Sequence, residues 1–250
     1  MTVGTSLPVS AGTISNVSIS KYQDVQLNGG ILGLSGTLDS SYSGQIILAT
    51  SDGIFGVWCI DLLHDIYLGG SYTYTQAPLV TNSLRDSGVL NGAKSQYQSL
   101  TASQILGISE LSALGNAVLL SDPVGTPQLV PTAIYTSDLA KVSGADLAMF
   151  GADSAAFSAA IQASIWNLEY GTTAIGSADF KADMSLIAAN MDYFSNIGGF
   201  VMDLSSNAQQ QFVSAIPEPG SFAVLSVGLI SLGIVRRRKT SPRQRRLEAI

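Results

Sequence analysis

Apolar, β-branched and aromatic residues gather in four short runs near the beginning of the chain. These runs span residues 13–20, 25–34, 45–50 and 54–63. Turn-forming sequences interrupt them at Asn28-Gly29-Gly30 and Ser51-Asp52-Gly53. Because β-branched and aromatic residues favour extended chains and these small polar residues favour tight turns, the pattern predicts β-hairpins.

Farther along, the spacing of apolar residues moves toward three and four, which is typical of helices. Residues 83–120 and 137–190 show this spacing and are rich in Ala and Leu. Residues 199–204 and 209–213 are extended in pattern again, and we expect them to pair back onto the first sheet. This order predicts an α+β fold, with a β-sandwich or barrel-like sheet and an inserted helical subdomain.

The carboxyl-terminal segment has a different pattern. An apolar run at residues 221–235 is followed at once by Arg236, Arg237, Arg238 and Lys239. Such a run partitions into lipid, and short basic segments beside it are held on the cytoplasmic side, so we expect residues 1–216 to lie outside. The run is shorter than the roughly 20 residues that span a bilayer comfortably. It therefore predicts a single, temporary transmembrane helix.

Pro217, Glu218 and Pro219 stand before this run. A Pro-Glu-Pro motif, a short apolar helix and an Arg-rich terminus, in this order, resemble the PEP-CTERM sorting signal. The resemblance implies export in a bacterium that makes exopolysaccharide, transient anchoring in the inner membrane, and cutting near the motif by an exosortase-type membrane protease. The alternative is a plain membrane anchor in which the motif is accidental.

These observations divide the chain into three parts. Residues 216–250 form the sorting signal with its basic tail at 236–250, and residues 13–215 form an extracellular domain. Residues 1–12 lack Lys and Arg, whereas an export leader begins with a basic segment and an apolar one. We therefore interpret them as a candidate remnant of a signal peptide. The final location would be the cell surface or the extracellular matrix.

The charge distribution excludes one class of partner. Residues 1–215 carry 5 basic and 16 acidic side chains. Nucleic-acid binding needs a basic surface that displaces counterions from phosphates, and this segment has none. We expect no nucleic acid as a partner. About 200 residues are enough for one sizeable hydrophobic core.

Cys59 is the only cysteine, so it cannot form an internal disulfide. It is a buried core residue, an intermolecular partner or a thiol with a chemical use. On a strand, Phe55, Val57, Cys59 and Asp61 would face one way and Trp58 and Ile60 the other. Both faces are largely apolar, which indicates a central strand. Asp61 would orient a proton beside Cys59 or make a structural hydrogen bond.

Residues 153–170 predict a helix, with Asp153 or Ser154 as its N-cap and a core stripe of Phe157, Ile161 and Leu168. Gln162 lies beside this stripe. Small residues one turn before it would let a strand approach closely. Trp166, one turn after it, would exclude water.

The sequence Ile161-Gln162-Ala163-Ser164-Ile165-Trp166, with Trp58-Cys59 upstream, resembles the bacterial surface thioester domains that are named for a Thr-Gln-x-Ala motif. The resemblance covers residues 55–170. It differs at Ile60, where the family often has Tyr, and at Ile161, where the motif has Thr. It implies a thioester that joins Cys59 to Gln162, supported by Trp58, Asp61 and Trp166, which would react with an amine on a surface or matrix ligand.

Other chemistry has less support in the sequence. His64, the only histidine, falls on the opposite strand face from Cys59, so a Cys-His hydrolase would need a bend. One His and one Cys cannot fill a zinc shell without several carboxylates, and we expect no metal and no cofactor. Two hypotheses remain, a covalent-binding surface module and a non-reactive structural protein of the biofilm matrix. Neither is an enzyme.

Overall fold

The computed structural model describes residues 10–28, 37–51, 53–60, 68–79, 89–90, 93–94, 100–120, 144–190, 198–204 and 211–216. The chain forms two units, Met1–Ile216 and Pro217–Ile250, and every described residue belongs to the first unit. The expected sorting motif, transmembrane helix and basic tail lie outside the described residues, as do residues 1–9 of the candidate leader remnant. Among the helices that are described, none is long and apolar enough to span a membrane.

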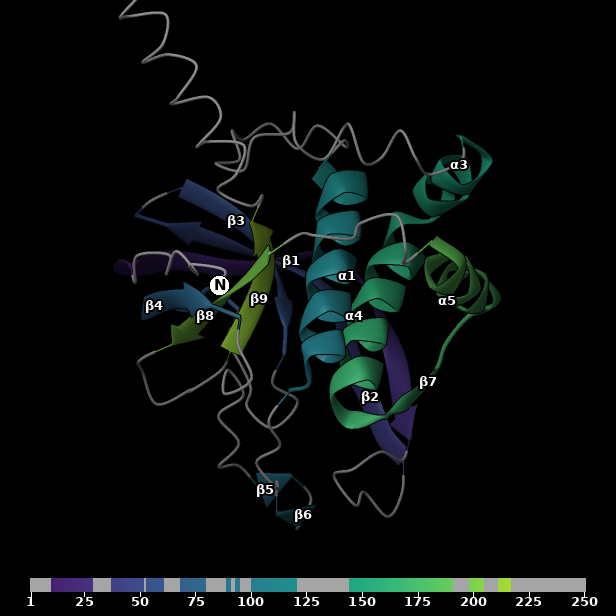
Figure 1. Cartoon of the computed structure of the whole chain (residues 1–250), viewed down its shortest axis with the longest axis horizontal. Helices are drawn as coiled ribbons and strands as arrows, with labels where there is room; N and C mark the ends of the chain where they lie inside the picture. The colour runs from purple at the N-terminus through teal and green to yellow at the C-terminus, as the bar shows by residue number, and fades with distance from the viewer. Residues whose placement is uncertain are drawn as a thin grey trace, which may run out of the picture. The chain divides into compact units, whose positions relative to one another are not determined.

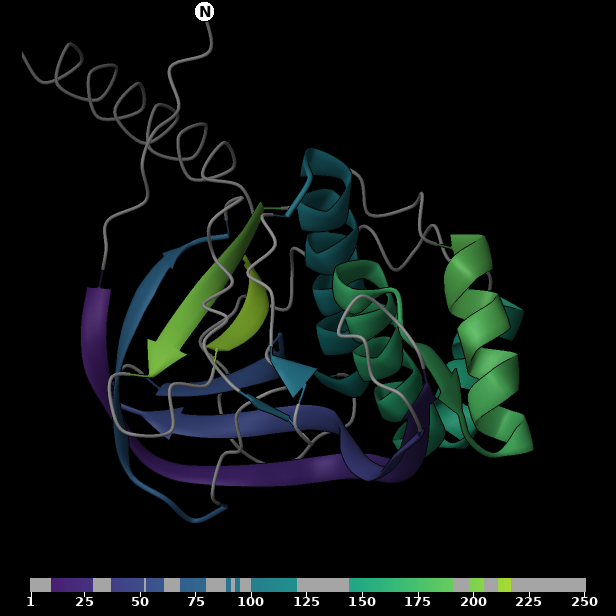
Figure 2. The same ribbon diagram turned by 90° about the horizontal axis from the view of Figure 1, so that it is seen from below.

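Seven strands form one antiparallel sheet. They are β1 (Ser10–Asn28), β2 (Thr37–Thr50), β3 (Gly53–Cys59), β4 (Tyr72–Pro78), β7 (Thr173–Ile175), β8 (Gly198–Leu204) and β9 (Gln211–Ile216). The strand order is β2-β3-β9-β8-β4-β1-β7, and β1 also pairs with β2. The pairings therefore close a ring of six strands, to which β7 is added. The sequence predicted either a β-sandwich or a barrel-like sheet. The observed sheet is curled, as in the barrel-like alternative (Figure 1, Figure 2).

Strand β1 is one long strand where the sequence pattern predicted two. Its register with β2 shifts between Ile14 and Asn16, between Ile19 and Lys21, and between Val25 and Leu27. Such irregularities bend a strand and increase its twist. They let β1 pair with β4 at its beginning and with β2 and β7 farther on.

The other strands confirm part of the prediction. β2 and β3 form the expected hairpin around Ser51-Asp52-Gly53, with Thr50 opposite Gly53. β8 and β9 pair with each other and join the first sheet through β4 and β3. Strand β4 was not predicted, and a short hairpin of β5 (Val89–Leu90) and β6 (Ala93–Lys94) replaces part of the helix predicted over residues 83–120.

The described helices are α1 (Ala102–Leu120), α3 (Gly144–Ala152), α4 (Ser154–Tyr170) and α5 (Ala178–Asn190). β7 interrupts the helical stretch predicted over 137–190. Both ribbon views show the helices on one side of the curled sheet, with α1 and α4 adjacent (Figure 1, Figure 2). Helix α1 packs on β8 and β9, and α4 packs on β1 and β2.

Helix α4 is buried around most of its circumference. Asp153 is its N-cap and accepts hydrogen bonds from the backbone N–H groups of Ala155 and Ala156, each at 3.1 Å. Gly171 ends the helix in the left-handed conformation, with φ 66°. The predicted stripe residues Phe157 and Ile161 are buried, and Leu168 is partly buried. Because α1, α5 and the sheet surround it, α4 also buries Ser158, Gln162 and Glu169.

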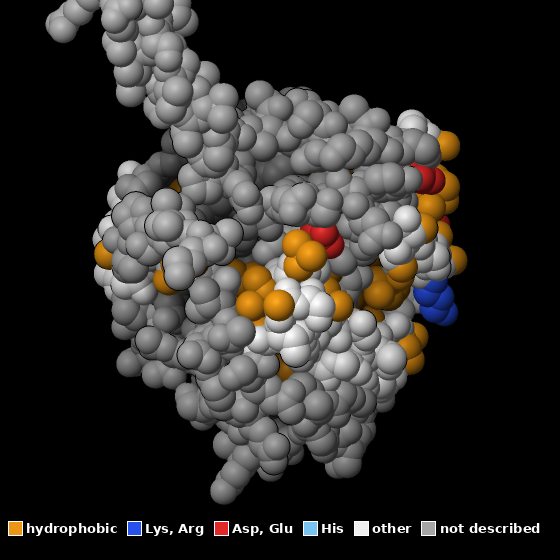
Figure 3. Space-filling view, viewed as in Figure 1, with side chains coloured by type: hydrophobic (Ala, Val, Ile, Leu, Met, Phe, Trp, Pro, Cys, Tyr) orange, Lys and Arg blue, Asp and Glu red, His pale blue; other side chains and the backbone are white. Residues whose placement is uncertain are grey.

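The described surface that faces the viewer in Figure 3 carries small, separate groups of apolar atoms and few charged side chains. The large apolar side chains that are exposed come from different parts of the chain: Tyr22, Leu68, Leu106, Met149 and Ile175. They do not indicate a single docking surface.

Candidate functional site

The backbone of Cys59 lies where the β2–β3 hairpin opens. The ladder between these strands ends at the pair Ile46 and Val57. Beyond it, β2 continues along β1, and Cys59 pairs with Phe212 of β9. Residues 55–60 are all buried, which confirms the prediction of a central strand. Helix α4 packs against β2 at this place.

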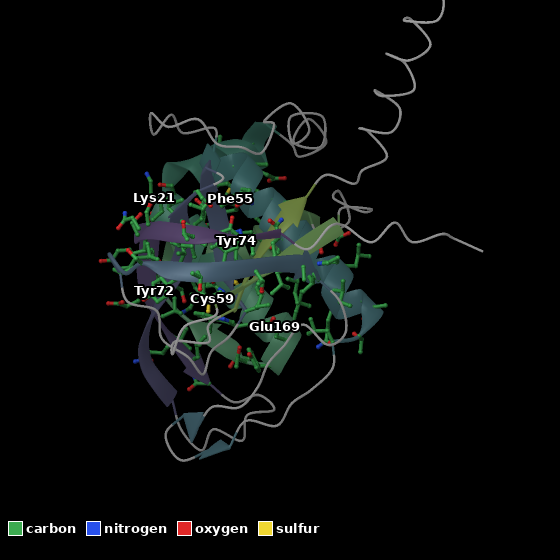
Figure 4. The ribbon with its side chains drawn as sticks, turned by 90° about the vertical axis from the view of Figure 1, so that its left-hand side faces the viewer. Lys21, Phe55, Cys59, Tyr72, Tyr74 and Glu169 are labelled. Carbon is green, nitrogen blue, oxygen red and sulfur yellow. The ribbon has the colours of Figure 1, made fainter. Side chains whose placement is uncertain are left out.

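Gln162 of α4 is joined to Cys59 through both ends of its carboxamide. The backbone N–H of Cys59 donates to Gln162 Oε1 at 2.9 Å, and Gln162 Nε2 donates to the carbonyl oxygen of Cys59 at 2.6 Å. Cys59 is 5% exposed and Gln162 is 1% exposed. The structure therefore brings the two residues together, about a hundred positions apart in sequence, in a site from which water is largely excluded. Figure 4 shows Cys59 toward the middle of the fold.

Two further side chains fasten α4 to the same strands. Ser158 Oγ accepts a hydrogen bond from the backbone N–H of Gln45 at 2.8 Å. The hydroxyl of Tyr170 donates to the carbonyl oxygen of Ile60 at 3.0 Å. Ser158 precedes Gln162 by four residues and Tyr170 follows it by eight, so the three share one side of the helix. This side of α4 supplies hydrogen bonds at the point where β2 and β3 separate.

A buried polar group on α1 supports the strands from the second helix. Asn116 Oδ1 accepts hydrogen bonds from Gln45 Nε2 at 2.8 Å and from Trp58 Nε1 at 3.3 Å. Gly115 allows this contact, because a Cβ at that position would overlap the indole of Trp58. A Cβ at Gly56 would lie 2.6 Å from Gln45 Nε2. The two glycines therefore permit α1 to approach the hairpin closely.

Of the three residues predicted to support the thioester, the structure describes Trp58 and Trp166 but not Asp61. Trp58 is completely buried and bonded to α1. Trp166 is 4% exposed, and its Nε1 has no hydrogen-bond partner within the described part of the chain. Asp61 and His64 lie outside the described residues. So do Pro217, Glu218 and Pro219, and the arginines Arg236, Arg237 and Arg238.

Helix α5 carries a buried carboxyl group whose pKa is raised. Burial, and then the carboxylates of Asp153 and Asp179, raise the pKa of Asp183 to about 7. Asp183 is 4% exposed, and burial in a medium of low polarity disfavours its charged form. Over the described ranges, no group of three or more His, Cys, Asp or Glu side chains could hold a metal ion.

Sequence reasoning did not find several residues that hold the site. Asn116 carried a signal, because it is a polar residue within the apolar run of α1. Gln45 and Tyr170 carried none, since their partners are distant in sequence. Ser158 was recognised only as a small residue, whereas its hydroxyl holds β2.

Comparison with known proteins gives a distant similarity. Neither a protein-family model nor a curated protein matches the chain. Among solved structures, the chain is similar to the N-terminal thioester domain of a surface protein from Clostridium perfringens, with a TM-score of 0.37 and 9% sequence identity. The match covers 77% of this chain and 98% of that domain.

Proposed function

We propose that the domain forms a thioester between Cys59 and Gln162 and uses it to bind amine partners covalently. The observation that carries this proposal is the pair of hydrogen bonds, at 2.9 Å and 2.6 Å, between the Gln162 carboxamide and the backbone of Cys59. They hold an acyl group beside the residue that bears the only thiol of the chain. Such enforced proximity supplies most of the drive for a reaction that is slow in solution.

In the first step, the Cys59 sulfur attacks the carboxamide carbon of Gln162. A C–S bond forms, the C–N bond breaks, and the thiol proton leaves with the nitrogen as ammonia. Negative charge develops on Gln162 Oε1, to which the Cys59 N–H already donates at 2.9 Å. A donor in place before reaction stabilises such an oxyanion. The bond from Gln162 Nε2 to the Cys59 carbonyl is lost as ammonia departs.

In the second step, a primary amine attacks the thioester carbon. A C–N bond forms, the C–S bond breaks, and one amine proton moves to the sulfur, so that the products are a substituted amide at Gln162 and the free thiol of Cys59. Burial of both residues keeps water from the bond. The large indole of Trp166, one turn from Gln162, contributes to this exclusion.

We further propose that the domain is exported and displayed on the cell surface or in the extracellular matrix. The support is the sequence order of Pro217, Glu218 and Pro219, the apolar run at 221–235, and Arg236, Arg237 and Arg238. In this proposal an exosortase-type membrane protease cuts near the motif while the apolar run is in the inner membrane. Replacing Glu218 with Ala should leave the uncut chain in the membrane fraction, as measured by immunoblotting.

The second candidate function is a non-reactive structural protein of the exopolysaccharide or biofilm matrix. One observation favours it. The carboxamide of Gln162 forms hydrogen bonds with the backbone N–H and carbonyl of Cys59, and Cys59 lies beyond the end of the β2–β3 ladder. An amide in that position also has a purely structural use.

Intact mass spectrometry distinguishes the two candidates. The chain with a thioester is lighter by one ammonia, and methylamine makes it heavier by one methylamine. Cys59→Ala and Gln162→Glu should show neither change, because the first lacks the nucleophile and the second has no amide nitrogen to lose. An unmodified mass and a titratable thiol in the native chain would refute the thioester and favour the structural role.

A further inference from the structure

Four residues spaced four apart form a row along α4 on the side that carries Gln162. They are Ser158, Gln162, Trp166 and Tyr170, and residues four apart are neighbours on the surface of a helix. Ser158, Gln162 and Tyr170 form hydrogen bonds with backbone atoms where β2 and β3 separate. Trp166 stands between two of these residues, and its N–H donor has no acceptor in the described part of the chain.

This N–H group is deeply buried. Trp166 is 4% exposed, so water does not replace the missing acceptor. By contrast, the Nε1 atom of Trp58 donates to Asn116 Oδ1 at 3.3 Å. A buried donor without a partner lowers the stability of the fold, because it has lost its hydrogen bond to water. Such a donor needs an explanation, and one explanation is an acceptor that forms only during a reaction.

An acceptor of this kind lies one turn earlier on the same helix. Gln162 Oε1 accepts a hydrogen bond from the Cys59 N–H at 2.9 Å, and a carbonyl oxygen has two lone pairs. The Cβ atoms of residues four apart on a helix are about 5–6 Å from each other. The indole of Trp166 and the carboxamide of Gln162 are together long enough to bridge this separation.

We propose that the indole N–H of Trp166 is the second donor to the oxyanion that develops on Gln162 Oε1 during thioester chemistry. The inference rests on the proposed function of Cys59 and Gln162. As the carboxamide carbon becomes tetrahedral, its oxygen leaves the plane of the amide and becomes the acceptor for the indole. The Cys59 N–H remains the first donor. A donor that is used only in the transition state lowers the barrier without stabilising the resting amide.

The bonding changes are those of acyl transfer at a single carbon atom. An electron pair of the Cys59 sulfur forms the C–S bond, and the carbonyl π pair moves to Gln162 Oε1. That pair returns as the C–N bond breaks, and ammonia leaves with the thiol proton. When an amine attacks the thioester, the same oxygen carries the charge again, and the sulfur leaves with one amine proton. Trp166 keeps its proton in both steps, so it is a catalytic residue that binds the oxyanion.

The test removes the donor and preserves the shape of the side chain. 3-Benzothienylalanine has sulfur where tryptophan has N–H, and site-specific incorporation places it at position 166 of the full chain. After refolding from urea, intact mass follows the loss of ammonia and then the addition of methylamine. We expect both rates to fall by about 100-fold, the effect of removing one oxyanion donor. The midpoint of urea unfolding should stay the same or rise, because an unpartnered donor has been removed.

Two variants separate this role from packing. Trp166→Phe removes the same donor and should slow both steps at least as much. Phe150→Leu truncates a fully buried ring on α3 that packs against Phe157, with 4.6 Å between the ring centroids. It should lower the midpoint of urea unfolding and leave both rates nearly unchanged.

The outcomes distinguish this inference from the proposed function. Wild-type rates in the benzothienylalanine chain would overturn the role of Trp166 and leave the thioester intact. Slower reaction that appears only together with a lower unfolding midpoint would assign the indole to packing and overturn its role as a donor. The absence of ammonia loss in wild type would refute the thioester and, with it, this role.

Discussion

The hydrogen bonds of Gln162 give a prediction for stability that is independent of the thioester. Gln162→Leu preserves the approximate size of the side chain but removes the acceptor of the Cys59 N–H and the donor to the Cys59 carbonyl. Both bonds are buried. Each buried polar group that loses its partner costs about 1–3 kcal/mol, and repacking of the new side chain offsets part of this. We expect the free energy of unfolding to fall by about 2–4 kcal/mol.

The measurement uses Cys59→Ala as the background, because this chain retains the backbone groups of residue 59 and cannot form the cross-link. Urea unfolding followed by tryptophan fluorescence gives the stability difference between this background and the same chain with Gln162→Leu added. Gln26→Leu, at an exposed position of β1, is the matched control and should change stability by less than about 0.5 kcal/mol. A loss no larger than the control's would refute the assignment of these hydrogen bonds.

Three further predictions concern the surroundings of the site. Gly115→Ala should lower stability by about 1–3 kcal/mol in urea unfolding, because its methyl group overlaps the buried indole of Trp58. Asn116→Leu should shift tryptophan emission and lower the melting temperature, since Trp58 and Gln45 lose a shared acceptor. The raised pKa of Asp183, about 7, should make stability fall by about 1–2 kcal/mol between pH 5 and pH 8 after allowance for water screening, and Asp183→Asn should remove this dependence.

The sign of the pH effect follows from proton binding. The folded chain holds the Asp183 proton at pH values where the unfolded chain has released it, so stability is highest in acid and is lost as pH rises through about 7. An unchanged slope in Asp183→Asn would assign the effect to another group. A Gly115→Ala chain as stable as wild type would show that α1 can retreat from Trp58, and unaltered emission in Asn116→Leu would contradict the indole hydrogen bond.

The sequence predicted helices and strands that have a local signal, such as a capping residue or a regular apolar spacing. It missed those that form only because distant parts of the chain pair with them. Asp153 and the apolar residues after it marked α4 because capping and helical spacing are local. Strand β4 was missed because, of its residues, only Tyr74 is buried, so it has no apolar run. Residues 21–24, which are mostly polar, fell between two predicted strands, yet β1 continues through them because β2 pairs with that segment.

In the candidate site, too, the sequence identified some residues but could not predict the contacts between them. Cys59 and Gln162 could be selected from the sequence because their residue types and neighbours form a pattern. Their meeting depends on the register of β3 and on the packing of α4 against β2, which no local signal encodes. The same holds for Asn116, whose partners Gln45 and Trp58 are 71 and 58 residues away.

The closure of the strand ring has a consequence for how the chain acquires its structure. β3 and β4 follow each other in sequence, but the hairpin of β8 and β9 stands between them in the sheet. During synthesis, the hydrogen-bonding edges of β3 and β4 must therefore wait for the last strands while all of the described helices are being made. Long-range pairing of this kind slows folding, and open strand edges promote aggregation. A chain that ends before Gly198 should accumulate as insoluble protein even though it contains both Cys59 and Gln162.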